Sequence, residues 1–275
     1  DLTQDALKAK GIAVDIAALR TARDVWVLDP TRGSRQRVTA EPSSDFGAVW
    51  TPDGRSLIYM SERPLFELYR RAADGSRAAE PLLTGSHDRI IGALSADGRL
   101  LAFSLSVPGS AELWTVPLQG APEARKYLAN GSQLGHPAIS PNGRWMAYDS
   151  DESGRVEVYL QSFPDPTGAR RQLSSGGGTE PVWTRGGREL VFRRGDSVMV
   201  ATVEPQSGEV GVPTTLFSGP YSDEPEWSAP PSYDVSSDGQ RFLLLKRPTT
   251  DLRRQVVIVT GWWAELRARV AGAEQ

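Results

Sequence analysis

The side chains best suited to chemistry in this chain are its two histidines and the charged residues that could act with them. His87 is followed directly by Asp88 and Arg89, and the second histidine is His136. An imidazole beside a carboxylate could transfer protons, and the same groups could instead hold a polar ligand. A structural role is the third possibility, because buried polar side chains commonly satisfy neighbouring backbone groups. Which role applies depends on the fold that positions them.

Patterns of more specialised sites are weak. The chain has no cysteine, no Gly-x-Ser-x-Gly segment, and no His-Arg-Asp or Asp-Phe-Gly of a kinase. Residues 174–179 (SSGGGT) could cradle a phosphate, but an extended run follows them rather than a helix, which favours an ordinary loop. Asp149, Asp151 and Glu152 could wrap a hard cation, but they lack the ligand spacing of a calcium loop, which favours a solvated hairpin. We predict no catalytic residue, no metal site and no cofactor.

Five segments of the chain are versions of one another. Each has a short apolar run, a turn of Asp-Gly, Asn-Gly or Gly-Gly, and a second apolar run; they are residues 50–61, 94–105, 139–150, 183–194 and 235–246. These turn pairs tolerate the positive φ of a tight hairpin. Their glycines are 44, 45, 44 and 52 residues apart, and they are Gly54, Gly98, Gly143, Gly187 and Gly239. That period is typical of a four-stranded propeller blade.

Two further extended runs follow most of these hairpins, and the last run is the most polar. Residues 24–29 and 35–39 match the third and fourth runs of an additional unit whose first two runs are not recognisable. The sequence therefore predicts an all-β, six-bladed β-propeller of four-stranded antiparallel blades over residues 23–262, with its first blade incomplete. Residues 1–22 would form an N-terminal segment, helix or strand, in which residues 11–16 supply one replacement strand. Residues 263–275 would form a short C-terminal helix and tail.

Alignment of the repeats predicts where the polar residues lie. It places five residues at one position of the innermost strand: Gly47, Ile91, His136, Glu180 and Ser232. Such positions face the mouth of the central channel of a propeller. With the adjoining inter-blade loops they predict a ligand-binding rim made of Asp45, His87, Asp88, Arg89, His136 and Glu180. The alternative is that His136 and Glu180 satisfy backbone groups of neighbouring blades.

A Pro-rich insertion lengthens the last repeat interval and carries two aromatic residues, Tyr221 and Trp227. Long loops are often where a repeat protein contacts partners, and aromatic side chains dominate such contacts. We therefore predict a partner-contacting loop around Tyr221 and Trp227. A simple lengthened crossover between blades is the alternative.

Composition restricts the class of partner. The 275 residues carry a net charge of -3 and no continuous Lys/Arg stripe, so we expect no nucleic acid partner. No run approaches the roughly 20 apolar residues that span a bilayer, and no signal peptide is recognisable, so we expect no direct membrane insertion. A monomer that binds a protein or peptide, or alternatively a glycan, fits these features.

The most specific stretch is residues 140–159 (SPNGRWMAYDSDESGRVEVY), continued by residues 175–183 (SGGGTEPVW). It resembles the Asp-Gly, WD-repeat-like propellers of TolB-like proteins. The likeness is greatest to the propeller that follows the kinase and membrane segment of some bacterial serine/threonine protein kinases. It covers residues 23–266 and carries over no catalytic residue.

The resemblance implies a non-catalytic sensor or scaffold domain of a larger bacterial signalling or envelope protein, in a periplasmic or extracytoplasmic location. The alternatives are the gating propeller of a serine peptidase and a propeller lyase or hydrolase with a funnel active site. The last of these would need two or more clustered acid–base groups, and the presence of only two histidines and a mixed Gly/Ile/Glu/Ser ring argues against it.

Overall fold

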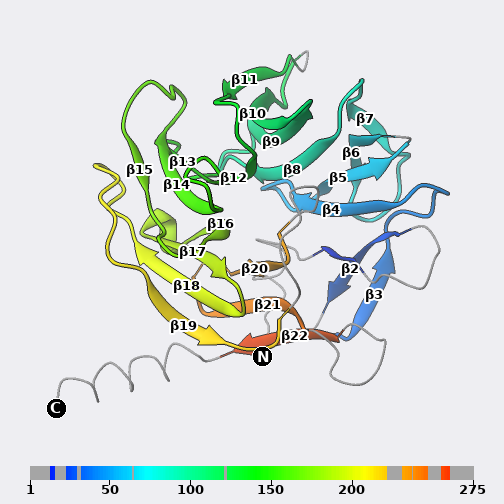
Figure 1. Ribbon diagram of the computed structural model, residues 1–275. Helices are drawn as coiled ribbons and strands as arrows, with labels where there is room; N and C mark the ends of the chain where they lie inside the picture. The colour runs from blue at the N-terminus through cyan, green and yellow to red at the C-terminus, as the bar shows by residue number, and fades with distance from the viewer. Residues whose placement is uncertain are drawn as a thin grey trace.

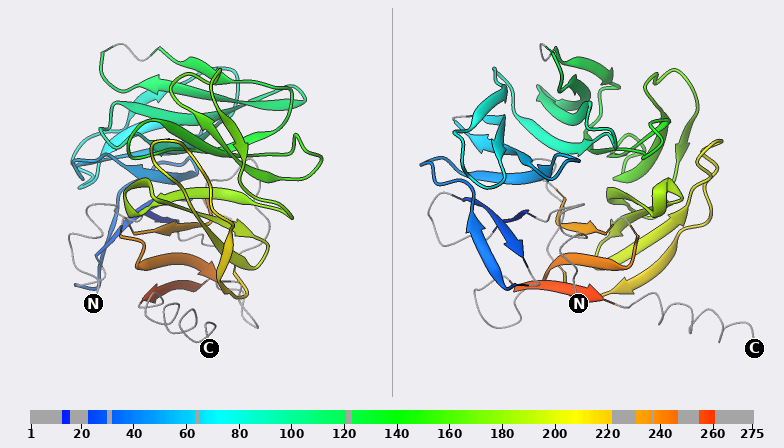
Figure 2. Two further views of the ribbon diagram at one scale, coloured as in Figure 1. Left: turned by 90° about the vertical axis from the view of Figure 1, so that its left-hand side faces the viewer. Right: turned by 180° about the vertical axis from the view of Figure 1, so that it is seen from behind.

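The computed structural model describes residues 13–15, 23–29, 32–63, 65–120, 123–221, 231–236, 238–246 and 255–260. These residues form six antiparallel sheets, numbered here in chain order, that surround a common centre (Figure 1). The first strand of each four-stranded sheet is innermost, and the view from behind shows the same ring (Figure 2). The prediction of an all-β propeller with four-stranded antiparallel blades is confirmed.

The strands of the first half of the chain make sheets 1 to 3. Sheet 1 contains β1 (Ala13–Asp15), β2 (Val25–Asp29) and β3 (Ser34–Arg37). Sheet 2 contains β4 (Asp45–Trp50), β5 (Ser56–Glu62), β6 (Phe66–Ala72) and β7 (Glu80–Leu83). Sheet 3 contains β8 (Arg89–Leu94), β9 (Leu100–Val107), β10 (Ser110–Pro117) and β11 (Arg125–Leu128).

The second half makes sheets 4 to 6. Sheet 4 contains β12 (Leu134–Ile139), β13 (Trp145–Ser150), β14 (Glu157–Ser162) and β15 (Arg170–Gln172). Sheet 5 contains β16 (Thr179–Thr184), β17 (Glu189–Arg194), β18 (Ser197–Thr202) and β19 (Thr214–Ser218), with the short 3₁₀ turn η1 (Arg185–Gly187). Sheet 6 contains β20 (Tyr233–Val235), β21 (Arg241–Lys246) and β22 (Gln255–Thr260).

Sheet 1 shows how the incomplete first unit is built. β1 pairs antiparallel with β2, so the prediction that residues 11–16 supply a replacement strand is confirmed for Ala13–Asp15. The predicted C-terminal helix and most of residues 1–22 lie outside the described residues. Within the described part of the chain, no helix is long and apolar enough to cross a membrane.

In four of the five repeats, the first hairpin is closed by local side-chain hydrogen bonds. In sheet 2, Thr51 Oγ1 donates to Asp53 Oδ1 (2.6 Å) and accepts from Ser56 N (3.0 Å). Three other sheets repeat this arrangement with the pairs Ser95–Asp97, Ser140–Asn142 and Ser236–Asp238. Gly54 follows at φ 65°, a left-handed conformation that glycine adopts without a Cβ clash. The spacing that these repeats share therefore reflects one turn geometry used repeatedly.

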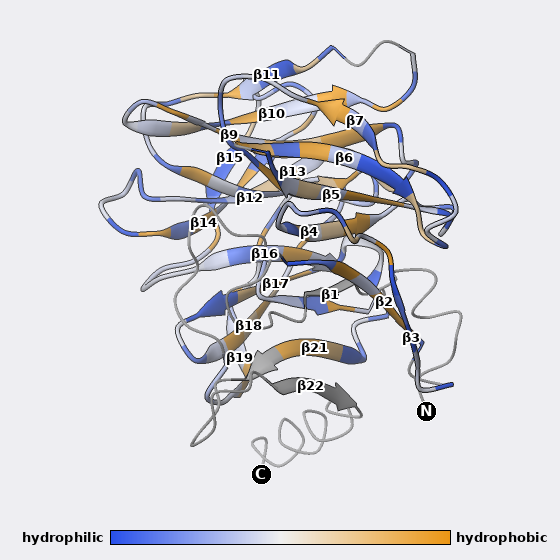
Figure 3. Cartoon of the chain, turned by 90° about the vertical axis from the view of Figure 1, so that its right-hand side faces the viewer, coloured by the Kyte–Doolittle hydropathy of each residue, from blue (hydrophilic) through white to orange (hydrophobic). Residues whose placement is uncertain are grey.

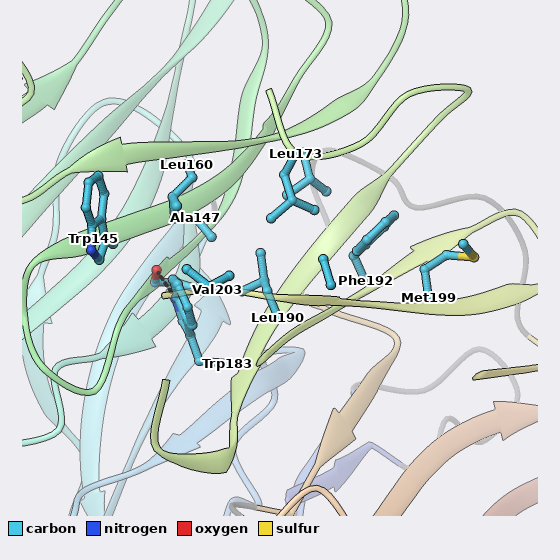
Figure 4. Packing of buried hydrophobic residues seen from close by; sticks show 12 residues of the cluster. Trp145, Ala147, Leu160, Leu173, Trp183, Leu190, Phe192, Met199 and Val203 are labelled. Atoms are coloured by element: carbon cyan, nitrogen blue, oxygen red, sulfur yellow. Dashed lines mark hydrogen bonds between the residues drawn. The ribbon is translucent and has the colours of Figure 1, made fainter. Parts of the chain in front are cut away.

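Apolar side chains fill the seams between neighbouring sheets. A separate buried cluster lies at each seam from sheets 1 and 2 to sheets 5 and 6. Figure 4 shows the one between sheets 4 and 5, where Trp183 packs with Trp145, Leu190 and Val203. The outermost strands β3 and β15 are hydrophilic (Figure 3). This gradient agrees with the fall in hydrophobicity along each repeat.

Candidate functional site

A β-bulge interrupts each of the inner strands β4, β8, β12 and β16, so that two residues oppose one on the neighbouring strand. The first bulge residue has a left-handed backbone in three of them: Gly47 (φ 64°), His136 (φ 45°) and Glu180 (φ 55°). A non-glycine residue in this region costs on the order of 1–3 kcal/mol. Contacts around His136 and Glu180 must therefore hold them there.

The spacing-based alignment holds for these three residues and is wrong for Ile91. Ile91 pairs regularly with Phe103, and the bulge of β8 begins one residue later, at Gly92. Ser232 precedes β20 by one residue, yet its hydroxyl reaches the Glu180 carboxylate. The inner strands thus share the bulged position, but the repeat spacing locates it only to within one residue.

Asp149 on β13 is the centre of a buried polar cluster beside the bulges. Its Oδ2 accepts hydrogen bonds from His136 Nδ1 (2.7 Å), Thr179 Oγ1 (2.6 Å) and Glu180 N (2.8 Å). Asp149 is 0% and His136 3% exposed. Burial alone would raise the pKa of Asp149, but the charge of His136 and these hydrogen bonds outweigh it and lower that pKa.

Glu180 extends the cluster from sheet 4 through sheet 5 to sheet 6. Its Oε2 accepts from Ser232 Oγ (2.8 Å), its carbonyl accepts from Tyr233 Oη (2.8 Å), and Arg193 Nη1 donates to Ser232 Oγ (3.0 Å). Glu180 is 2% exposed, and burial raises the pKa of its carboxyl although His136 and Ser232 oppose the rise. We call His136, Asp149, Thr179, Glu180, Arg193 and Ser232 the inter-sheet cluster.

Asp45 lies at the start of β4, at the corresponding end of sheet 2. Its Oδ1 accepts from Ser61 Oγ (2.5 Å) and Ser43 Oγ (3.1 Å), and its backbone N donates to Arg23 O (2.8 Å). Burial raises the pKa of its carboxyl, and the hydroxyl donors only partly offset this. Asp45 is fully buried, so it supports the strand from inside.

The three remaining rim residues brace the loop between sheets 2 and 3. Asp88 Oδ1 accepts from Phe66 N (2.9 Å), and Arg89 Nη1 donates to His87 O (2.8 Å). Burial lowers the pKa of Arg89. His87 is half-buried, with Ser86 Oγ 3.0 Å from its Nδ1. Asp88 therefore binds the first residue of β6, while Arg89 binds its own loop.

No protein-family model matches the chain. The Tol-Pal system protein TolB of Anaeromyxobacter dehalogenans (strain 2CP-1) is 34% identical over 140 residues, which are 48% of this chain and 30% of that protein. The crystal structure of TolB from Acinetobacter baumannii has a TM-score of 0.71 at 18% identity, and the match covers 90% of this chain and 60% of that one. The chain is a β-propeller similar to TolB.

The TolB-like propeller thus matches only 30% of the length of that curated relative. The fold is also similar to an oligogalacturonate lyase solved with manganese, with a TM-score of 0.57 at 17% identity, over 86% of this chain and 68% of that one. The likeness to kinase-associated propellers stays a prediction.

The glycine-rich loop of this TolB-like propeller is closed by one of its own carboxylates. Glu157 Oε1 accepts from Gly176 N (2.9 Å) and Gly177 N (3.0 Å), while Oε2 accepts from Ser174 Oγ (2.5 Å). These are the donors that a phosphate would need, so the ordinary-loop interpretation of residues 174–179 agrees with the structure. Sequence reasoning missed Glu157, although an acidic residue also begins the third run of two other repeats, at Glu67 and Glu112.

The three acidic residues considered for a cation are separated by their contacts. Asp149 belongs to the inter-sheet cluster, Asp151 Oδ1 accepts from Gln133 N (2.9 Å), and Glu152 pairs with Arg170. In the described parts of the TolB-like propeller, no three His, Asp or Glu side chains are grouped as a metal site.

The predicted partner loop is described only in part. The Tyr221 ring packs edge-on against Phe217, with centroids 5.8 Å apart, and is half-buried; Trp227 lies outside the described residues. An open groove of about 970 Å³ lies between sheets 5 and 6, and none of the predicted rim residues lines it. It is lined by Arg185, Arg188, Glu189, Thr202, Val203, Glu204, Pro205, Glu209, Val210, Gly211, Asp238 and Gln240.

Proposed function

We propose that this TolB-like propeller is a non-catalytic binding domain for a protein partner and is part of a larger bacterial envelope or signalling protein. The observation that carries the proposal is the burial of the acid–base groups at the inner strands. A general acid or base must reach the proton that it transfers. His136, Asp149 and Glu180 are at most 3% exposed and are bonded to neighbouring sheets. Their arrangement favours a rigid scaffold over a reaction centre.

In this proposal the buried residues hold the sheets in place and the surrounding loops contact the partner. His87, Asp88, Arg89 and Tyr221 are the partly accessible members of the predicted surface among the described residues. Asp45, His136 and Glu180 are buried and support it from below. The name of the A. dehalogenans relative, a Tol-Pal system protein, supports a protein partner and a periplasmic or extracytoplasmic setting.

Calorimetric titration tests this function. The purified chain is titrated with the other proteins of the Tol-Pal system of the bacterium that encodes it. We expect saturable binding that His87→Ala weakens. Arg99→Ala, on an exposed hairpin turn, is the matched surface control and should bind like the parent chain.

A folded chain that binds none of these proteins would count against the proposal. The decisive contrary result is turnover: release of unsaturated product from oligogalacturonate with added Mn²⁺ would make the lyase alternative correct. His136→Ala should then abolish that turnover.

A further inference from the structure

The seam between sheets 1 and 2 contains buried polar atoms that no other group satisfies. In the described structure, Trp50 Nε1, Tyr59 Oη and Arg63 Nη2 are buried without a hydrogen-bond partner. Asp45 Oδ2 and Arg71 Nε are in the same condition. Leaving a buried donor or acceptor unpaired costs the free energy of removing it from water. This seam therefore carries a penalty in its closed state.

Equivalent positions elsewhere in the ring do have partners. Trp183, four residues before its turn glycine like Trp50, donates from Nε1 to Ala138 O of the preceding sheet (3.0 Å). Tyr148, five residues after its turn glycine like Tyr59, accepts from Arg170 Nε (3.3 Å). Trp50 and Tyr59 therefore lack partners that the equivalent residues of sheets 5 and 4 have, although Asp149 Oδ1 and Arg171 Nε on sheet 4 are also buried without a partner.

The seam between sheets 4 and 5 is closed by hydrogen bonds from buried side chains and backbone. Trp183 Nε1 donates to Ala138 O, and Thr179 Oγ1 and Glu180 N both donate to Asp149. At the seam between sheets 1 and 2, the described residues Val25 and Val38 pack against Leu57 and Tyr59.

The charged groups around Tyr59 would gain most from water. Asp45, Glu41, Arg63 and Arg71 all act electrostatically on its hydroxyl. Arg63 Nε donates to Ser61 Oγ (2.8 Å), and Arg71 Nη1 forms an ion pair with Glu41. Each guanidinium therefore has one bonded nitrogen and one buried nitrogen without a partner, Arg63 Nη2 and Arg71 Nε. Hydration would satisfy the remaining atoms and would offset part of the cost of the bonds that break when this seam opens.

We propose that the ring opens at the seam between sheets 1 and 2, so that sheet 1 separates from Trp50 and Tyr59 while the seams between sheets 2 and 5 stay closed. The structure thus contains a preferred opening point. Local openings of this kind have free energies below that of global unfolding. The cross-seam bonds that would break include Asp45 N to Arg23 O (2.8 Å) and Gln36 Nε2 to Asp74 O (2.5 Å).

Native-state hydrogen exchange of the full chain tests the opening. We expect backbone amides that bond within β2 and β3 to exchange at least about 100-fold faster than those of β13 and β17, with little dependence on low denaturant. Equal protection of sheets 1 and 4 would overturn the proposal.

Two matched pairs of variants test the cause. Tyr59→Phe removes an unsatisfied hydroxyl and should slow exchange in β2 by about tenfold, while Tyr148→Phe removes a satisfied one and should not slow exchange in sheet 4. Trp50→Phe and Trp183→Phe lose the same volume, so a smaller loss of protection for Trp50→Phe isolates the indole N–H. The explanation is overturned if Tyr59→Phe leaves the exchange rate in β2 unchanged or raises it. It is also overturned if Trp50→Phe and Trp183→Phe lose equal protection.

Discussion

The two buried carboxylates of the inter-sheet cluster should respond in opposite ways when their charge is removed. Glu180→Gln and Asp149→Asn keep side-chain size and remove one negative charge each. Glu180 has a raised pKa and Asp149 a lowered one, although both are almost fully buried. The difference arises because Asp149 accepts three hydrogen bonds at Oδ2, one from His136, whereas the side-chain donor to Glu180 is a hydroxyl.

The sign of each pH dependence follows from proton linkage. Folded Glu180 binds its proton more tightly than the unfolded chain does, so the free energy of unfolding falls as pH rises above its ordinary value of 4.5. Folded Asp149 binds its proton less tightly, so its contribution is present above 3.8 and is lost as pH falls through the lower folded value. Glu180→Gln should therefore stabilise at pH 7 and lose this advantage near pH 4. Asp149→Asn should destabilise at pH 7, with a deficit that shrinks below pH 3.8.

The magnitudes follow from the bonds at each site. A hydrogen bond to a charged group contributes about 1 kcal/mol more than a neutral one. Three such bonds give a loss of about 3 kcal/mol for Asp149→Asn, within the range for breaking a buried pair. At about 2–4 °C per kcal/mol for a chain of this size, its Tm should fall by about 6–12 °C. Glu180→Gln keeps an oxygen for Ser232 and should gain about 1 kcal/mol.

Calorimetric melting of the parent chain and both variants between pH 3 and pH 8 measures these effects. The reasoning is refuted if Glu180→Gln destabilises at pH 7 as much as Asp149→Asn does. It is also refuted if neither difference varies with pH.

Two further pairs of substitutions test single contacts. Gly98 and Gly143 share φ 67°, but a Cβ on Gly98 would lie 2.8 Å from Pro52 Cδ, while one on Gly143 would meet nothing within 4 Å. In urea unfolding, Gly98→Ala should therefore lose about 1–3 kcal/mol more free energy of unfolding than Gly143→Ala. Equal losses would contradict the contact with Pro52. Glu157→Gln should increase the rate of hydrogen exchange at Gly176 and Gly177, because these amides lose a charge-assisted acceptor. Glu67→Gln is the control, since the backbone bond that the Glu67 carboxylate accepts, from Gly85 N, is longer (3.3 Å), and it should change exchange in its loop less. A larger effect for Glu67→Gln would be inconsistent with the geometry.

The repeated hairpins were predictable because their determinants are local. Thr51 and Asp53 are bonded to each other, so the turn is written in a few consecutive residues. The left-handed inner position also had a signal, since Gly47 aligns with His136 and Glu180 and glycine adopts that conformation most easily.

The polar contacts of the cluster were not predictable. Thr179 and Asp149 are 30 residues apart and lie on different sheets, and whether they meet depends on the register of two bulged strands. A one-residue slip reverses the direction of every side chain, and Ile91 shows that the repeat spacing does not fix register to that accuracy. The partner of Gly176 was likewise hidden, because nothing in the glycine-rich loop indicates that Glu157, 19 residues earlier, fills it.

The short range of the turn contacts has a consequence for the order of folding. Thr51 and Ser56 are only five residues apart, so little chain entropy is lost when the hairpin closes, and isolated hairpins form within about 1–10 μs. Every repeat can therefore nucleate by itself and extend to its neighbour, as in other modular chains. Joining sheet 1 to sheet 6 requires the longest loop to close. We expect that step to be the slow one, reached after the interior of the array has already assembled.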